Sequence, residues 1–167
     1  MLDIIRRIGE VAPPPIRLSK LFESPKQHFF SFSINAGEEM ASVEVLQLLA
    51  EASVNVRFIS RHFGRAGEMN VQLCVDAAHG ARAMGIFQTE QIMRAVRKFH
   101  DNPGVVILSL YPFGGQPHIA TRICSALRTE GIRILGIGTA TSVFSCIIGI
   151  ENAASAVSVL KHAFVLR

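Results

Sequence analysis

Residues 116–138 read QPHIATRICSALRTEGIRILGIG, and this stretch decides the fold predicted for the chain. Pro117 favours the start of a helix, because its missing N–H would have no partner in the first turn anyway. Gly131 is expected to end the helix, since a residue without a Cβ readily adopts a positive φ. Ile132 and Ile134 then begin an extended, β-branched segment. The apolar stripe of the helix recurs at helical spacing and consists of Ile119, Ile123, Ala126 and Leu127.

A second copy of this unit lies earlier in the chain. A shift of 78 positions places the stripe Ala41, Val45, Leu48 and Leu49 on the stripe of the later helix. Ser53 takes the place of Gly131, and Phe30 and Phe32 take the places of Leu108 and Leu110. After the second strand the shift becomes 73, which gives the first copy a hairpin five residues longer. These matches in helix length, strand spacing and hairpin position predict a duplicated βαββα unit, with a fourth strand per copy left open.

The remaining pattern divides the chain into an N-terminal leader or linker (residues 1–24), a first domain (25–102) and a second domain (103–167). The fold class predicted is α+β. Residues 88–99 fit a helix or a strand equally well. Helices are predicted at 40–51, 78–87, 117–130 and 152–164, and strands at 27–36, 55–63, 68–76, 105–111, 132–139 and 142–150.

Composition limits the classes of function. The net charge of +4 gives a weak bias toward anionic partners, and no apolar run approaches the length of a membrane span. The N-terminus has no apolar signal core, so we expect a cytoplasmic protein without membrane contact. Three cysteines without C-x-x-C spacing indicate buried thiols in a reducing compartment. The six histidines show no i, i+4 pairing, so no metal is predicted.

Catalytic and cofactor motifs are missing from the sequence. It contains no phosphate-binding P-loop, no G-x-S-x-G and no H-E-x-x-H. Gly136-Ile137-Gly138 lacks the third glycine of the dinucleotide fingerprint and lies within a predicted strand. Phe30, Phe32 and Tyr111 fit the core pattern better than a base-stacking surface, so no nucleic acid is expected. We therefore predict a protein that is not an enzyme and carries no cofactor.

Six segments carry a resemblance to a known family: LLAEA (48–52), VNVRFIS (54–60), PHIA (117–120), CSAL (124–127), GIRI (131–134) and AVSVLKHAF (156–164). They resemble the tandem ACT domains in the regulatory half of aspartate kinases, and the resemblance covers residues 27–167. The resemblance implies two ferredoxin-like βαββαβ ACT domains, with antiparallel sheets packed against helices, that bind small effectors, usually amino acids, between domains. The kinase domain and its lysine-glycine-glycine motif have no counterpart, which implies a free-standing regulatory module.

Two loops that enter helices are candidate binding sites, since a helix N-terminus offers free N–H groups and a positive dipole end to a carboxylate. A pseudo-twofold axis would place each loop near the second strand of the other copy. The alternative is that both loops are ordinary turns. The predicted site joins Gly37 and Glu38 to Arg133 and Ile134, and joins Gly114, Gly115, Gln116, Pro117 and His118 to Asn55, Val56 and Arg57.

The chain departs from the family at these positions. GEEM at residues 37–40 replaces the acid-Pro-Gly entry to the first helix, and Arg61 and His62 replace amide-bearing positions. Arg57 stands where lysine-binding relatives tend to have an acid, and Arg133 where others have asparagine. A cationic effector would meet like charge there, so we expect an anionic or neutral one. The alternative is that these arginines project to solvent.

The resemblance also implies partners. We expect a homodimer formed through the ACT sheets, because the high apolar content, 49%, suits a chain that hides surface in an oligomer. An enzyme of amino-acid biosynthesis is a further expected partner. The alternative function is a ligand-free interaction or oligomerisation module, or the regulatory subunit of such an enzyme.

Overall fold

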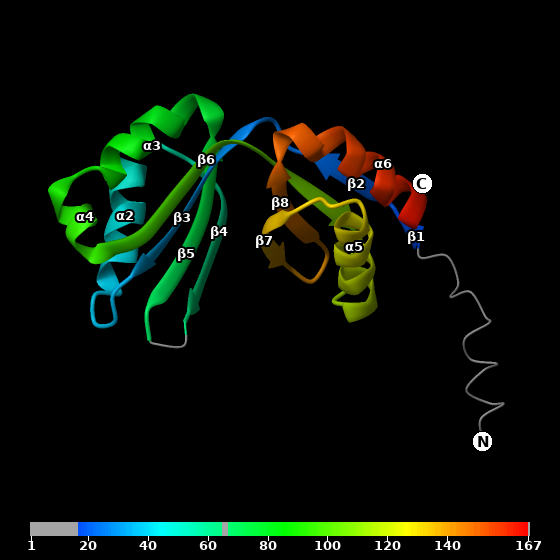
Figure 1. Ribbon diagram of the computed structural model, residues 1–167, viewed down its shortest axis with the longest axis horizontal. Helices are drawn as coiled ribbons and strands as arrows, with labels where there is room; N and C mark the ends of the chain where they lie inside the picture. Colours follow the sequence, from blue (N-terminus) through cyan, green and yellow to red (C-terminus); the bar gives the residue numbers. More distant parts are fainter. Residues whose placement is uncertain (1–16, 65–66, 167) are drawn as a thin grey trace, which may run out of the picture.

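The computed structural model describes the backbone of residues 17–64 and 67–166 (Figure 1). Most of the predicted leader therefore lies outside the described residues. The helices are α2 (Met40–Glu51), α3 (Gly80–Phe87), α4 (Glu90–Ala95), α5 (Pro117–Thr129) and α6 (Ala153–Ala163). The strands are β1 (Arg17–Leu18), β2 (Lys20–Glu23), β3 (Gln27–Ile34), β4 (Val56–Phe63), β5 (Met69–Asp76), β6 (Val96–Tyr111), β7 (Ile134–Thr139), β8 (Phe144–Gly149) and β9 (Val165–Leu166).

The first unit is an antiparallel sheet in the order β4-β5-β3-β6, covered on one face by α2, α3 and α4. Period-two alternation in β3 and β5 turns one set of apolar side chains toward these helices. Phe30 pairs with Leu73 across the two strands, and both are fully buried. They pack with Val45 and Leu49 of α2, two members of the predicted stripe.

The second unit uses the later half of the long strand β6. It pairs with β8, which pairs with β7, and α5 and α6 cover the outer face. Ile119, Ile123 and Leu127 of α5 are buried in its core, as the stripe predicts. After each first helix the backbone adopts a positive φ, 70° at Gly131 and 54° at Ser53. Two units of this kind confirm the α+β class and the ferredoxin-like arrangement.

The N-terminal segment corrects the leader prediction. Within the described residues, β2 pairs with β6, from Lys20 opposite Tyr111 to Glu23 opposite Leu108, and takes the place of the missing fourth strand of the second unit. Leu18 is 1% exposed in the core of that unit. Residues 17–23 thus belong to the second unit although they precede the first. Such a short strand has too few residues for alternation to reveal it.

The ambiguous segment 88–99 contains both structures. Residues 90–95 form α4, and Val96 then turns extended (φ −83°, ψ 135°) and begins β6. This strand continues through residue 111 and serves both units, so the predicted boundary between residues 102 and 103 falls inside a continuous strand. A helix and a strand that meet without a turn explain why the pattern favoured neither.

Strand β6 joins the two units into one seven-stranded sheet, whose two halves face each other with their helix-free sides, and the helices lie outside on both flanks (Figure 1). Between them lies an apolar cluster, here called the seam, of Phe29, Cys74, Val105, Ile107 and Ile147, flanked by Phe58 and Leu135. The Gln72 amide Nε2 donates to the carbonyl oxygen of Leu135 at 3.0 Å and ties the units together. Burial raises the pKa of the Cys74 thiol to about 12. None of the described helices is long and apolar enough to span a membrane.

Two glycines of α3 differ sharply in their surroundings, and substitutions there test the packing. A Cβ on Gly80 would lie 2.2 Å from Nδ1 of His28, whose ring stacks on Phe30 and whose Nε2 is 2.9 Å from Asp101 Oδ2. We expect Gly80→Ala to lower the free energy of unfolding by about 1–3 kcal/mol. A Cβ on Gly85 would have no other atom within 4 Å, so Gly85→Ala should raise the free energy of unfolding by about 0.5–1 kcal/mol.

Urea denaturation followed by circular dichroism measures both changes. The close packing of His28 under α3 would be disproved if the two substitutions shifted stability in the same direction.

Candidate functional site

In the first predicted loop, some of the hydrogen-bond donors are used within the loop itself. Gly37 has a φ of 89°, and its N–H donates to Glu39 Oε1 at 3.0 Å, a bond that lowers the pKa of that carboxyl. Glu38 accepts from Asn35 Nδ2 at 2.9 Å. Among the described contacts none joins this loop to Arg133 or Ile134. The N–H group expected to bind a ligand carboxylate is therefore taken by Glu39.

The second predicted loop also forms a turn. Gly114 and Gly115 have φ values of 62° and 65°, and the Gln116 N–H donates to the carbonyl oxygen of Phe113 at 3.2 Å. Gly114, Gly115, Gln116, Pro117 and His118 are all exposed. The structure places their predicted partners elsewhere: Asn55 is exposed, Val56 packs on the core of the first unit, and Arg57 pairs with Asp76. Within the described part of one chain, both loops form turns, and ligand binding at them stays a prediction.

A cavity of about 470 Å³ lies where the chain passes from β2 to β3, and we call it the Arg57 cavity. Strands β4 and β5 supply its charged pair, and the later half of β6 supplies its apolar wall. It is therefore lined by both units. Its lining residues are Phe22, Glu23, Ser24, Pro25, Gln27, Arg57, Asp76, Ile107 and Ser109.

Two of the three charged side chains that line this cavity, Arg57 and Asp76, form an ion pair, and Glu23 is the third. Arg57 donates to Asp76 through Nε (2.9 Å) and Nη2 (2.8 Å), and these hydrogen bonds raise the pKa of Arg57 and lower that of Asp76. Since Asp76 neutralises Arg57, the like-charge argument against a cationic effector fails here. The Arg57 side chain is still 54% exposed, so it projects partly to solvent while it pairs with Asp76.

Gln27 adds an unusual polar group to the Arg57 cavity. The residue is 1% exposed, and its Nε2 donates to the carbonyl oxygen of Pro25 (3.0 Å) and to Asp76 Oδ1 (3.4 Å). These bonds fix the amide, and its buried Oε1 has no hydrogen-bond partner among the described residues. A buried acceptor without a donor costs free energy. Gln27 therefore lines the cavity with an amide whose unpaired oxygen is itself buried.

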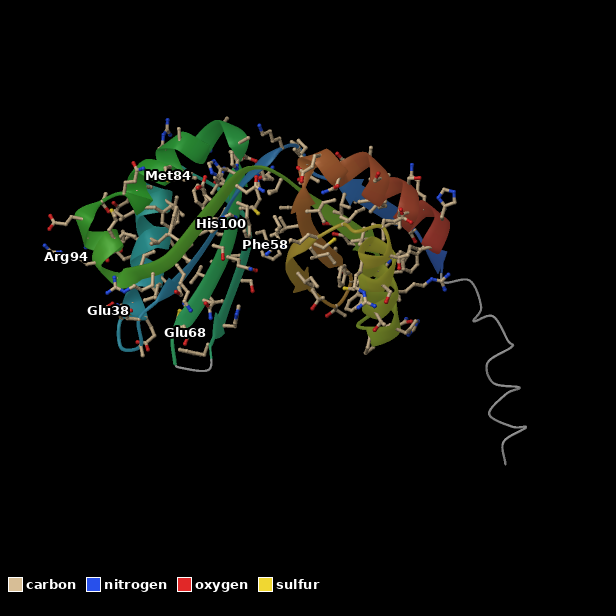
Figure 2. The ribbon with its side chains drawn as sticks, viewed as in Figure 1. Glu38, Phe58, Glu68, Met84, Arg94 and His100 are labelled. Atoms are coloured by element: carbon tan, nitrogen blue, oxygen red, sulfur yellow. The ribbon has the colours of Figure 1, made fainter. Side chains whose placement is uncertain are left out.

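A second cavity, of about 280 Å³, lies on the other side of the seam, and we call it the Arg133 cavity. Strands β3, β5, β6 and the start of β7 surround it, and Figure 2 shows His100 of β6 near the middle of the molecule. Its ionisable groups are His100 and Arg133, and no carboxylate from the described part of the chain lines it. The lining residues are Phe29, Ser31, Gln72, His100, Arg133, Ile134 and Leu135.

The structure therefore keeps Arg57, Arg133 and Ile134 as cavity residues but changes their neighbours. Gln27, Ser31, Gln72, Asp76 and His100 were not predicted as site residues. The sequence does contain a signal for two of these residues: Ser31 and Gln72 are polar residues inside apolar strands, and they pair with each other across β3 and β5. Polar positions inside two adjacent buried strands indicate a polar lining on the face opposite the core.

Tandem ferredoxin-like units joined through one long strand define the class of the fold, which is that of ACT-type regulatory regions. No family model matches the sequence, and no curated protein matches it.

Comparison with solved structures shows which proteins share this fold. The chain superposes on the regulatory subunit of aspartate kinase from Thermus thermophilus, in its ligand-free form, with a TM-score of 0.77 and 17% identity over 88% of this chain and 99% of that one. The corresponding subunit from Thermus flavus superposes with a TM-score of 0.76 and 18% identity, over 87% of this chain and 97% of that one. The aspartate kinase from Synechocystis superposes with a TM-score of 0.76 and 18% identity, over 98% of this chain and 30% of that one. The fold is thus that of the regulatory region of aspartate kinases.

Proposed function

We propose that the protein is a non-catalytic regulatory module that binds a small effector, an amino acid, between its two ACT-like units and regulates a partner enzyme of the cytoplasm. Three observations support this proposal. The fold is shared with regulatory subunits of aspartate kinase over nearly their whole length. The sequence contains none of the catalytic motifs considered above. The Arg57 cavity lies between the units and combines charged and polar groups.

The Arg57 cavity carries the proposal because its charges complement a zwitterion. The guanidinium of Arg57 is suited to the carboxylate of an amino acid, and the carboxylate of Asp76 to its ammonium group. A volume of about 470 Å³ is within the usual range for small-molecule sites. Phe22 and Ile107 offer apolar surface to the ligand side chain.

Ligand binding in the Arg57 cavity can change the relative arrangement of the two units, because the cavity walls come from both. Ser24 in the wall is tied to the second half of β6: its N–H donates to the Ile107 carbonyl oxygen at 3.0 Å, and its Oγ accepts from the Ile107 N–H at 2.9 Å. Arg57 and Asp76 belong to the first unit. A ligand held by both walls would favour one relative arrangement of the units over others.

A homodimer formed through the sheets is part of the proposal. Strand β4 is an edge of the sheet, and its Ile59 and Phe63 are 45% and 66% exposed. Met40 and Val43 of α2 add further exposed apolar surface on the same unit. An exposed apolar edge strand is a surface that natural proteins usually cover. This surface also supports the second candidate function, an interaction module that binds no ligand.

Titration of the full chain with a panel of amino acids separates the two candidates. We expect one amino acid to bind and to raise the melting temperature, because a ligand of the native state stabilises it. Asp76→Asn, which keeps the shape but removes the charge, should weaken that binding about tenfold or more. Glu130→Gln removes an exposed carboxylate at the end of α5 and should leave the affinity unchanged.

If no amino acid binds, the ligand-free interaction module is the better description. Equal affinities of the wild type and the Asp76→Asn variant would place the effector outside the Arg57 cavity.

A further inference from the structure

We propose that the Arg133 cavity is a second, separate site that binds a small dianion, either a dicarboxylate or a phosphate. Its lining differs in charge from that of the Arg57 cavity. Glu23 and Asp76 line the Arg57 cavity beside its single arginine, whereas Arg133 and His100 face no lining carboxylate. The two cavities therefore select ligands of different charge on opposite sides of the seam.

Arg133 is the principal anchor. Its guanidinium has no ion-pair partner among the described residues, in contrast to Arg57 and Arg94, which pair with Asp76 and Glu90. A guanidinium presents donors in a planar fork that matches two oxygens of a carboxylate or phosphate. Arg133 lies immediately before β7, so the backbone that carries it is held by the sheet. The strongest donor of this cavity is thus uncommitted and placed at its rim.

Groups from the first unit face the same cavity. His100 offers a ring N–H, and the half-buried Ser31 offers a hydroxyl donor. Gln72 forms part of the wall: its Nε2 is used by the Leu135 carbonyl oxygen, so its amide fixes the distance between β5 and β7. An anion bound by Arg133 and His100 would bridge the two units. Donors converging from both sides of a junction are the arrangement expected of a binding site.

The size of the cavity limits the ligand. About 280 Å³ lies just below the usual range for small-molecule sites, which suits an anion of few heavy atoms. Phe29, Ile134 and Leu135 supply the apolar part of the wall, while the two ionisable side chains, Arg133 and His100, are exposed and accessible to a ligand from solution.

Calorimetric titration of the full chain at low ionic strength, with inorganic phosphate and with succinate as probes, tests the proposal. We expect at least one probe to bind, and the preferred probe identifies the dianion as a phosphate or a dicarboxylate. Arg133→Gln should weaken binding about tenfold or more. Arg128→Gln, a matched change of an exposed arginine in the last turn of α5, should leave it unchanged. Raising the salt concentration should also weaken binding, since the anchoring charges are partly exposed.

A second readout is the imidazole resonance of His100, identified by its loss in His100→Gln, which should shift on addition of the bound probe. The proposal is overturned if neither probe binds, or if Arg133→Gln and Arg128→Gln bind as the wild type does. Because Arg133 does not line the Arg57 cavity, loss of the anion site with amino-acid binding intact would leave the proposed function standing.

Discussion

A chain that begins at Pro25 is expected to lose the cooperative fold of its second unit. The deletion removes β2, whose four residues pair with Leu108–Tyr111 along one edge of β6. It also removes Leu18, which is 1% exposed in the core of the second unit, and Leu21, which packs against that core. Leu18→Ala alone should lower the free energy of unfolding by about 2–5 kcal/mol. That is a large fraction of the roughly 5–15 kcal/mol that stabilises a typical domain.

Urea denaturation of the full chain, of Leu18→Ala and of the shortened chain measures this effect. Ser19→Ala is the matched control, since Ser19 is the exposed neighbour of Leu18 and should change stability by no more than about 0.5 kcal/mol. Hydrogen exchange should localise the loss to β7 and β8 in the shortened chain. An unchanged denaturation midpoint for the chain beginning at Pro25 would show that residues 17–24 are dispensable, as a leader would be.

The repeated unit could be predicted because local patterns determine it. Helix α2 has the same bounds as the predicted helix 40–51, since Val45 and Leu49 fall on one face at helical spacing. Ser53 and Gly131, which the shift of 78 positions aligns, both adopt a positive φ. Such features depend on residues within a dozen positions of one another, which is the range over which period and turn chemistry act.

The site could not be predicted to the same depth, because it depends on the register between distant strands. Nothing local distinguishes Arg57 from Arg133, and both were expected to repel a cation. The pairing of β3 with β5 sets Gln27 opposite Asp76, and Arg57 reaches the same carboxylate from β4. Arg133 has no such neighbour among the described residues. One arginine is therefore neutralised and the other is left free, a difference that only the tertiary structure determines.

Ile147→Ala is expected to weaken binding in both cavities although Ile147 lines neither. The side chain is fully buried in the seam. On one side, Ile147 pairs across the strands with Ile107, a wall residue of the Arg57 cavity. On the other side, its Cδ1 lies 3.0 Å from the position that a Cβ would occupy if Gly136 had one. The same position is close to Gln72 of the Arg133 cavity. Shortening this side chain lets both walls shift.

The neighbouring residue separates this effect from a general loss of stability. Ile148 is equally buried but belongs to the core under α5 and α6. Ile147→Ala and Ile148→Ala should each lower the free energy of unfolding by about 2–5 kcal/mol. We expect Ile147→Ala to lower the affinity for the amino acid and for the anion by between about twofold and thirtyfold. Ile148→Ala should leave both affinities unchanged at temperatures where the variant is folded. Calorimetric titration of the two variants with each ligand decides the matter: equal affinities in both would mean that the seam holds the units together without linking their cavities.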